Sequence, residues 1–252
     1  MINEEFFIVN SDDFGYSTSI NHATIEAFNH DKINSATIMA NMPGFEEAVE
    51  LAHTNKVADK IGAHLVLTEG TPLTDEIKCL EYLFTGPLVA STKYKELFYL
   101  SKEKKNLIFN ELVAQIEKIR KCHINITHVD THYHIHSMWP IIQILTRLLK
   151  DYKIPSMRIQ FNLIKQNPFI DGYRNLLNRY IRFKKMNFSH YLGNQVYFLN
   201  TYGEKSDFWS GHKVEIMVHA DYDNEGKLAD RIGSEKSDFN FVSLLSENSG
   251  VR

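Results

Sequence analysis

A cluster of histidines in the middle of the chain, within THVDTHYHIHSMWP (127–140), concentrates the most reactive side chains of the sequence. Four histidines and one aspartate occupy its even-numbered positions: His128, Asp130, His132, His134 and His136. Imidazole and carboxylate groups bind metal ions and transfer protons. Because successive side chains of a β-strand point to opposite faces, these five side chains would share one face of a strand.

A single metal ion cannot contact all five of these side chains. On a straight strand with a rise of about 3.3 Å per residue, His128 and His136 would lie roughly 26 Å apart. We therefore expect the strand to end within the motif, and only some of the five residues to contact a metal directly.

Two adjacent carboxylates, Asp12 and Asp13, follow the apolar run Glu5–Asn10, which predicts a buried parallel strand. On a regular strand the two side chains would point to opposite sides, which favours two different roles. A bound cation would relieve the repulsion between them. The alternative is a purely structural role, in which an aspartate caps the following helix.

Isolated residues with similar chemistry occur in three other predicted strands: His64 in Lys60–Leu67, Arg158 in Ser156–Gln160 and His219 in Lys213–His219. A buried arginine requires a carboxylate partner, and Asp12 and Asp130 are both candidates for Arg158. A single histidine in an apolar strand is usually a core residue. His64 therefore indicates a metal site only in combination with a second ligand.

The rest of the chain alternates between strand and helix patterns. Further predicted strands are Ser35–Ala40, Asn125–Asp130 and Gln195–Leu199, and the predicted helices are Thr18–His30, Phe45–Ala52, Leu107–Cys122, Met138–Lys150 and the basic segment Asp171–Phe188. The mixed pattern of residues 75–105 predicts a loop with a short helix. Polar residues at strand ends are typical of a (β/α) barrel, with an open doubly wound sheet as the alternative.

Composition excludes several classes of function. The net charge is −3 and no long basic run occurs, so neither nucleic acid nor an anionic membrane is an expected partner. No glycine-rich phosphate-binding motif and no apolar run of about 20 residues is present. The two cysteines lack a CxxC spacing, which fits a reducing compartment, and the first residues do not resemble a signal peptide. We expect a cytoplasmic protein, with the basic helix as a solvated face or a homodimer contact.

Taken in order, the motifs resemble those of the YdjC-like carbohydrate deacetylases, the group that contains chitooligosaccharide deacetylases. The matching segments are NSDDFG (10–15), GAHLVLTEG (62–70), THVDTHYHIH (127–136), RI (158–159) and EIMVH (215–219). Two positions depart from the family pattern: Thr131 replaces a frequent serine, and Ala220 replaces a proline that often follows the late histidine. Neither departure removes a catalytic group.

The resemblance implies an α/β fold, a distorted (β/α) barrel of the glycoside hydrolase/deacetylase type, formed as one domain over residues 1–252. It also implies one divalent metal ion, magnesium or zinc, that takes part in removing an acetyl group from an N-acetylated amino sugar or oligosaccharide. The roles that it implies are metal ligation by Asp13, His64 and His132, general base by Asp12 and general acid by His219. With these roles, Arg158 would pair with Asp12 or Asp130, and Asp130 or His128 would hydrogen-bond a ligating histidine. His134 and His136 would lie past the strand end and line the sugar cleft or its rim.

Two other functions remain as alternatives. A metal-dependent phosphoesterase or amidohydrolase-type barrel commonly carries an HxH motif on the first strand, whereas this chain carries two aspartates there. A barrel that binds sugar without catalysis would not need the complete set formed by Asp12, Asp13, His64, His132 and His219.

Overall fold

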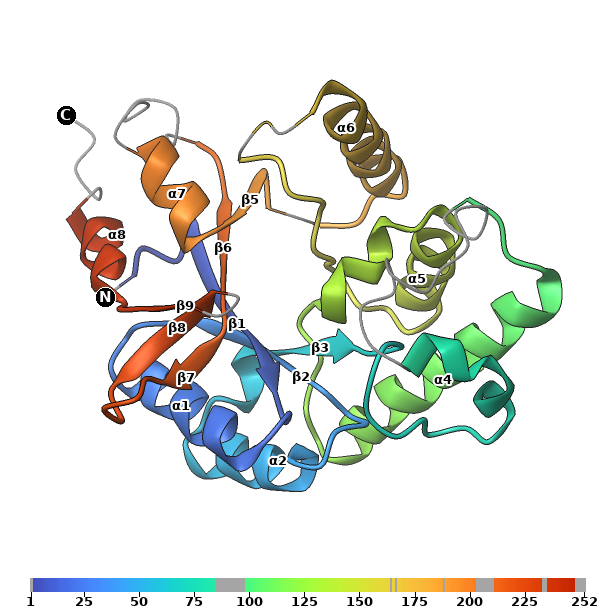
Figure 1. The fold of residues 1–252 in the computed structure, drawn as a ribbon, viewed down its shortest axis with the longest axis horizontal. Coiled ribbons are helices and arrows are strands. Elements are labelled where there is room, and N and C mark those ends of the chain that lie inside the picture. Colours follow the sequence, from blue (N-terminus) through green and yellow to red (C-terminus); the bar gives the residue numbers. More distant parts are fainter. Residues whose placement is uncertain are drawn as a thin grey trace.

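The computed structural model describes residues 2–84, 98–163, 165, 167–187, 189–202, 211–232 and 235–247. Its centre is a parallel sheet with the strand order β4-β3-β2-β1-β6-β5, curled into an open barrel (Figure 1). The strands are β1 (Phe7–Phe14), β2 (Ser35–Ile38), β3 (Ile61–Leu65), β4 (Val129–Thr131), β5 (Tyr191–Asn194) and β6 (Val214–Val218). The predicted distorted (β/α) barrel is thereby confirmed.

Helices connect these strands and cover the outside of the sheet. They are α1 (Thr18–Asn29), α2 (Phe45–Thr54), α4 (Lys102–Lys121), α5 (Trp139–Asp151), α6 (Pro168–Phe183), α7 (Gln195–Tyr202) and α8 (Leu244–Glu247). Short 3-10 segments cover Ala58–Lys60, Glu76–Phe84, His132–Ser137 and Asn240–Ser243. Residues 85–97, part of the predicted loop 75–105, lie outside the described residues. Among the described helices, none combines the length and the apolar composition needed to cross a bilayer.

Helix starts follow the local sequence. The hydroxyl of Ser17 accepts a hydrogen bond from Ile20 N at the start of α1, and the hydroxyl of Ser101 does the same for Lys104 N at the start of α4. A proline in the first turn opens α5 and α6, where its missing N–H is not needed.

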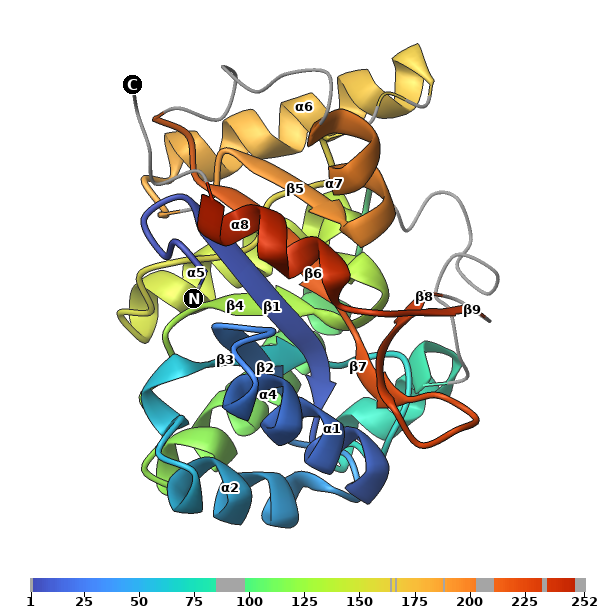
Figure 2. The same ribbon diagram turned by 90° about the vertical axis from the view of Figure 1, so that its left-hand side faces the viewer.

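A small antiparallel sheet follows the barrel: β7 (Ala220–Tyr222), β8 (Leu228–Ile232) and β9 (Glu235–Ser237). It lies beside α1, as Figure 2 shows, and Tyr222 Oη donates a hydrogen bond to Glu26 Oε2 of that helix at 2.9 Å. The amino-terminal segment lies near α8, where Asn3 N donates to Leu245 O. The small sheet therefore holds the chain that leaves β6 against the barrel.

Two predicted strands are wrong. Gln195–Leu199 belongs to helix α7, because the strand lies just upstream in β5 and Asn194 Oδ1 then accepts a hydrogen bond from Tyr197 N. Ser156–Gln160 forms only single bridges, Ser156 to Asn187 and Met157 to Val129. It cannot continue as a regular strand because the backbone N–H and carbonyl of Gln160 bind the side chain of Asn178.

Other predicted elements occur with shifted ends. The basic helix predicted at Asp171–Phe188 begins at Pro168 and ends at Phe183, and β1 continues beyond Asn10 to Phe14. The extension of β1 carries the paired aspartates inside the strand instead of in the loop after it.

The two faces of the sheet differ in character. Apolar residues such as Val9, Ala63 and Ile216 pack with the helices in one continuous core. The inside of the barrel instead holds a buried polar network, which includes Asn10, Asp12, Thr37, His64, Asp130, Arg158 and Glu215. The fold therefore encloses its reactive groups between strands, where the backbone fixes their positions.

Gly62 in β3 provides a test of this close packing. A Cβ atom there would lie 2.5 Å from His128 Cε1 and 2.7 Å from His128 O, so we expect Gly62→Ala to lower the free energy of unfolding by about 1–3 kcal/mol. In α6, a Cβ on Gly172 would have no neighbour within 4 Å among the described residues. Gly172→Ala is the matched control and should raise stability by about 0.5–1 kcal/mol. Urea unfolding measures both, and an unchanged stability for Gly62→Ala would contradict the packing.

Candidate active site

The paired aspartates occur where β1 loses its regular pairing. The register between β1 and β2 shifts between Ser11 and Phe14, and Asp13 has a φ of 67°. In this left-handed conformation Asp13 leaves the alternation of the strand, so it faces the same cavity as Asp12. The expectation that the two side chains point to opposite sides is therefore wrong, although their contacts differ.

Asp13 contacts two histidines, His64 of β3 and His132, which directly follows β4. Its Oδ1 lies 3.4 Å from Nε2 of His64 and 3.1 Å from Nδ1 of His132, and those two nitrogens are 3.2 Å apart. The three side chains are buried, and ligand atoms from all three lie within 4.8 Å of one another. The sequence-predicted ligand set thus comes together at one point.

These residues fit a divalent cation. Within the described part of the chain, Asp13 Oδ1 is buried and receives no hydrogen bond of good geometry. Two imidazoles and one carboxylate that leave coordination positions open form the donor set of a catalytic metal site. An ion between Asp13, His64 and His132 would satisfy the orphaned oxygen and both ring nitrogens.

Each histidine is also held by a carboxylate on the far side of its ring. His64 and Asp130 are register partners on β3 and β4, and Nδ1 of His64 lies 2.7 Å from Oδ1 of Asp130. Nε2 of His132 lies 2.6 Å from Oε1 of Glu69. Such contacts orient a ligating imidazole and direct its other nitrogen to the metal. Asp130 is therefore placed as the sequence predicted.

The electrostatics show how strongly the cluster attracts positive charge. Burial opposes the charge of His64, but Asp130 and Asp13 outweigh it and raise the pKa of His64 to about 10. Burial likewise opposes the charge of Asp13, yet the nearby imidazoles of His132 and His64 hold the pKa of that carboxyl well below its usual range. Both shifts show that positive charge is favoured beside Asp13, and binding of a metal ion there would compete with protons.

Arg158 lies fully buried beneath the cluster and contacts three carboxylates. Its Nη1 and Nη2 donate to the two oxygens of Asp12 at 2.6 and 2.7 Å. Nη1 also lies 2.8 Å from Asp130, and Nε donates to Glu215 at 2.5 Å. Where the sequence offered Asp12 or Asp130 as partner, the structure pairs Arg158 with both. The bidentate contact fixes the plane of the Asp12 carboxylate.

A cavity of about 370 Å³ opens above this network at the carboxyl ends of the strands. Its lining comprises Asp12, Asp13, His64, Thr131, His132, Tyr133, His134, Met217, His219 and Arg231. His219 follows β6, and its backbone N–H donates to Asp230 Oδ1 at 2.8 Å. The proposed base and acid therefore face the same space as the metal ligands.

The remaining histidines of the cluster diverge after β4 ends at Thr131, as expected for a strand that stops within the motif. His134 lines the cavity and contacts the ring of Phe161 at 4.6 Å between centroids, and burial lowers its pKa well below the usual value. His136 does not line the cleft. It is buried, with Nδ1 2.6 Å from the Thr131 hydroxyl and Nε2 donating to Ile159 O. Burial, reinforced by the charge of Arg158, lowers the pKa of His136 to about 4.

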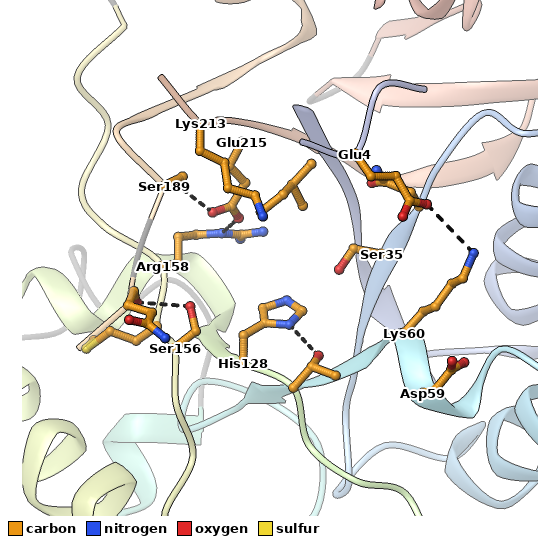
Figure 3. A pocket seen from close by; sticks show the side chains of 15 residues that line it. Glu4, Ser35, Asp59, Lys60, His128, Ser156, Arg158, Ser189, Lys213 and Glu215 are labelled. Carbon is orange, nitrogen blue, oxygen red and sulfur yellow. Dashed lines mark hydrogen bonds and ion pairs between the residues drawn. The ribbon is translucent and has the colours of Figure 1, made fainter. Parts of the chain in front are cut away.

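His128 faces a second cavity at the opposite, amino-terminal end of the strands (Figure 3). Its ring nitrogens lie 2.8 Å from the Thr127 hydroxyl and 3.1 Å from Asn10 Oδ1, so it contacts neither ligating histidine. Arg158 and Glu215 also border this cavity. The barrel interior therefore separates His128 from the candidate metal.

Sequence reasoning missed Glu69 and Arg231. Glu69 lies within the LTEG segment of the matched motifs, a few residues after the strand that carries His64. This position in the sequence could have indicated that Glu69 lies near the site. Arg231 comes from β8 in the small sheet, and its Nη2 lies 3.3 Å from Asp13 Oδ2. No pattern in the sequence places this residue near β1.

The buried Asp230 gives a test by pH. Burial, opposed in part by His219, raises the pKa of Asp230 to about 6, above the roughly 3.9 of an unfolded chain. The folded protein therefore binds more protons between these values, so the carboxylate costs stability above pH 6 and this cost vanishes below pH 4. Asp230→Asn should raise the free energy of unfolding by about 2 kcal/mol at pH 8 and by little at pH 4.

Urea unfolding at several pH values measures this difference. Asp59→Asn, at an exposed position, is the control and should change stability by less than about 0.5 kcal/mol throughout. A gain for Asp230→Asn that is independent of pH would contradict the assignment.

Comparison with known proteins agrees with the motifs. A family model described as YdjC-like protein matches residues 6–244. A carbohydrate deacetylase from Brevibacillus brevis is 31% identical over 222 residues, covering 88% of this chain and 83% of that protein. One from Halalkalibacterium halodurans is 30% identical over 226 residues, covering 86% of each.

A solved structure shares the fold. It belongs to a protein of Enterococcus faecalis V583 thought to cleave cellobiose phosphate, with a TM-score of 0.63 and 21% identity, and the match covers 87% of this chain and 82% of that one. The family model over residues 6–244 and the carbohydrate deacetylases at 30–31% identity confirm the resemblance first seen in the motifs: the chain belongs to the YdjC-like family.

Proposed function

We propose that this protein is a metal-dependent carbohydrate N-deacetylase that hydrolyses the acetamide group of an N-acetylated amino sugar or oligosaccharide. The observation that carries the proposal is the convergence of Asp13, His64 and His132 in a cavity that Asp12 and His219 also line. Relatives named carbohydrate deacetylase, at 30–34% identity, supply the substrate class.

The residues on one side of the substrate would activate the attacking water. A divalent ion held by Asp13, His64 and His132 would lower the pKa of a water molecule and polarise the acetyl carbonyl. Asp12 accepts the proton of the attacking water as its oxygen bonds to the carbonyl carbon. Arg158 and the amide of Asn10 hold the Asp12 carboxylate in place for this transfer.

The acid completes the reaction on the other side of the substrate. His219 in its protonated form donates a proton to the amide nitrogen as the C–N bond breaks. The products are acetate and the free amine of the sugar. The exposed ring of Tyr133, on the cavity wall, offers an aromatic surface to the sugar ring.

The proposal leaves the choice between zinc and magnesium to experiment. Imidazole ligands favour zinc by affinity, whereas family members are often described as magnesium-dependent.

We further propose one domain over residues 1–252 and a cytoplasmic location, which the unpaired Cys79 and Cys122 support. A homodimer contact through α6 is supported by its exposed Phe169 and Phe183. The proposal includes no nucleic-acid or membrane partner.

Acetate release from acetylated amino sugars, with zinc or magnesium and with a chelator, tests the function. We expect release that stops with the chelator and returns with one of the two ions. Release of phosphate from phosphoesters without any acetate would instead indicate a phosphoesterase. Sugar binding with neither product would indicate a barrel without catalysis.

Two variants test the assignment of roles. His132→Ala should lose the bound metal and with it all activity. Asp12→Asn should keep the metal and lower kcat by about 10²–10⁴, because it removes only the proton acceptor. Metal analysis of the purified variants, with circular dichroism to confirm folding, measures both. A metal-replete His132→Ala would contradict the ligand set.

A further inference from the structure

Glu69 stands out among the residues that the proposed mechanism does not use. It follows β3, in a turn closed by hydrogen bonds from the Asn41 amide to Glu69 O and from Thr71 N to Asn41 O. Gly70 completes the turn with a φ of 78°, and a Cβ there would lie 2.5 Å from Met42 Sδ. The backbone under Glu69 is therefore fixed before any ligand binds.

The side chain of Glu69 is directed at His132. Its Oε1 lies 2.6 Å from Nε2 of His132, which is the length of a charge-assisted hydrogen bond, and its Oε2 accepts from Tyr16 Oη at 3.3 Å. A carboxylate accepts only, so His132 must carry its proton on Nε2. The lone pair of Nδ1 is then available on the side of Asp13 and His64.

The two ligating histidines differ in how the fold supports them. His64 lies within β3, where Asp130 and Thr37 from the adjacent strands contact its ring. His132 lies just past the end of β4, and the two residues after it, Tyr133 and His134, have φ values of 50° and 51°. In this strained turn the strand no longer fixes the ring. Glu69 supplies the orientation that the backbone does not.

We propose that Glu69 is the positioning residue of the metal site: it sets the tautomer and orientation of His132 and thereby metal affinity, without contacting metal or substrate. The proposal rests on the metal site of the proposed function. It predicts that affinity falls when Glu69 is replaced although all three ligands remain.

The test is a titration of metal-free protein with Zn²⁺ or Mg²⁺ alone, with a chromophoric chelator as competitor for Zn²⁺ and calorimetry for Mg²⁺. We expect Glu69→Ala to weaken binding by about 10–100-fold, the usual effect of losing such a partner. Glu69→Gln should lose less, because its amide oxygen still accepts from Nε2. Tyr16→Phe is the matched control, since it removes a hydrogen bond to Oε2, the oxygen of Glu69 that does not face His132, and should leave the affinity unchanged.

A spectroscopic readout separates positioning from general loss of structure. In the zinc-loaded wild type, the Nε2 proton of His132 should give a slowly exchanging downfield proton signal. The signal should persist in Tyr16→Phe and disappear in Glu69→Ala. Near-ultraviolet circular dichroism checks that each variant is folded. If Glu69→Ala does not fold, the affinity and proton signal of Glu69→Gln decide whether Glu69 positions His132.

The outcomes distinguish this proposal from the metal site itself. Equal affinities for the wild type and for both Glu69 variants would overturn the role of Glu69 and leave the metal site standing. A wild type that binds neither ion would overturn the site and the positioning role together. If Tyr16→Phe weakens metal binding as much as Glu69→Ala, the loss comes from a general disturbance of the side chains around Glu69, and the specific role of Glu69 is refuted.

Discussion

The structure depends on one buried cation, Arg158. A guanidinium without solvent is costly unless its donors are fully paired, and here Asp12, Asp130 and Glu215 pair with it from three strands of the barrel. A buried carboxylate that lost Arg158 would lose its guanidinium partner while staying out of solvent, so each of these strands must keep its register. The desolvation cost of these charged groups is thus offset only when β1, β4 and β6 are correctly placed. The same contacts therefore stabilise the fold and position the residues of the site.

From Arg158 the constraint extends to the candidate metal. Arg158 and Thr37 bind one oxygen of Asp130, while the other oxygen contacts His64, which faces Asp13. This inner half of the site is built within the sheet and is almost inaccessible to solvent. The outer half is different, because His132 lies beyond the strand end and depends on Glu69 from the loop after β3. The site therefore joins a rigid ligand pair to one ligand whose orientation is set from outside the barrel.

Sequence reasoning placed most of the strands and paired Arg158 with Asp12 or Asp130 because these follow from residue type and period, whereas the candidate ligands came from the resemblance of the motifs to the YdjC-like family. It failed where the backbone leaves its regular pattern. The bulge that turns Asp13 inward has no signature beyond the two aspartates themselves. Gln195–Leu199 is rich in β-formers, yet Asn194 caps a helix there, so local propensity gave way to a capping contact. Arg231 reaches the site from a separate sheet, a long-range relation that no local pattern contains.

The turn after β4 explains why a run of histidines yields one ligand. A continued strand would have carried His134 and His136 away from Asp13 along a straight line. The left-handed conformations of Tyr133 and His134 instead kink the chain. The hydroxyl of Thr131 holds the kink in place through Nδ1 and the backbone N–H of His136. Since burial keeps the pKa of His136 near 4, that ring remains neutral beside Arg158 and adds no charge to the network. His136 thus stabilises the bend that places His132 beside Asp13 and His64, and a histidine of the same run supports the site without facing the cavity.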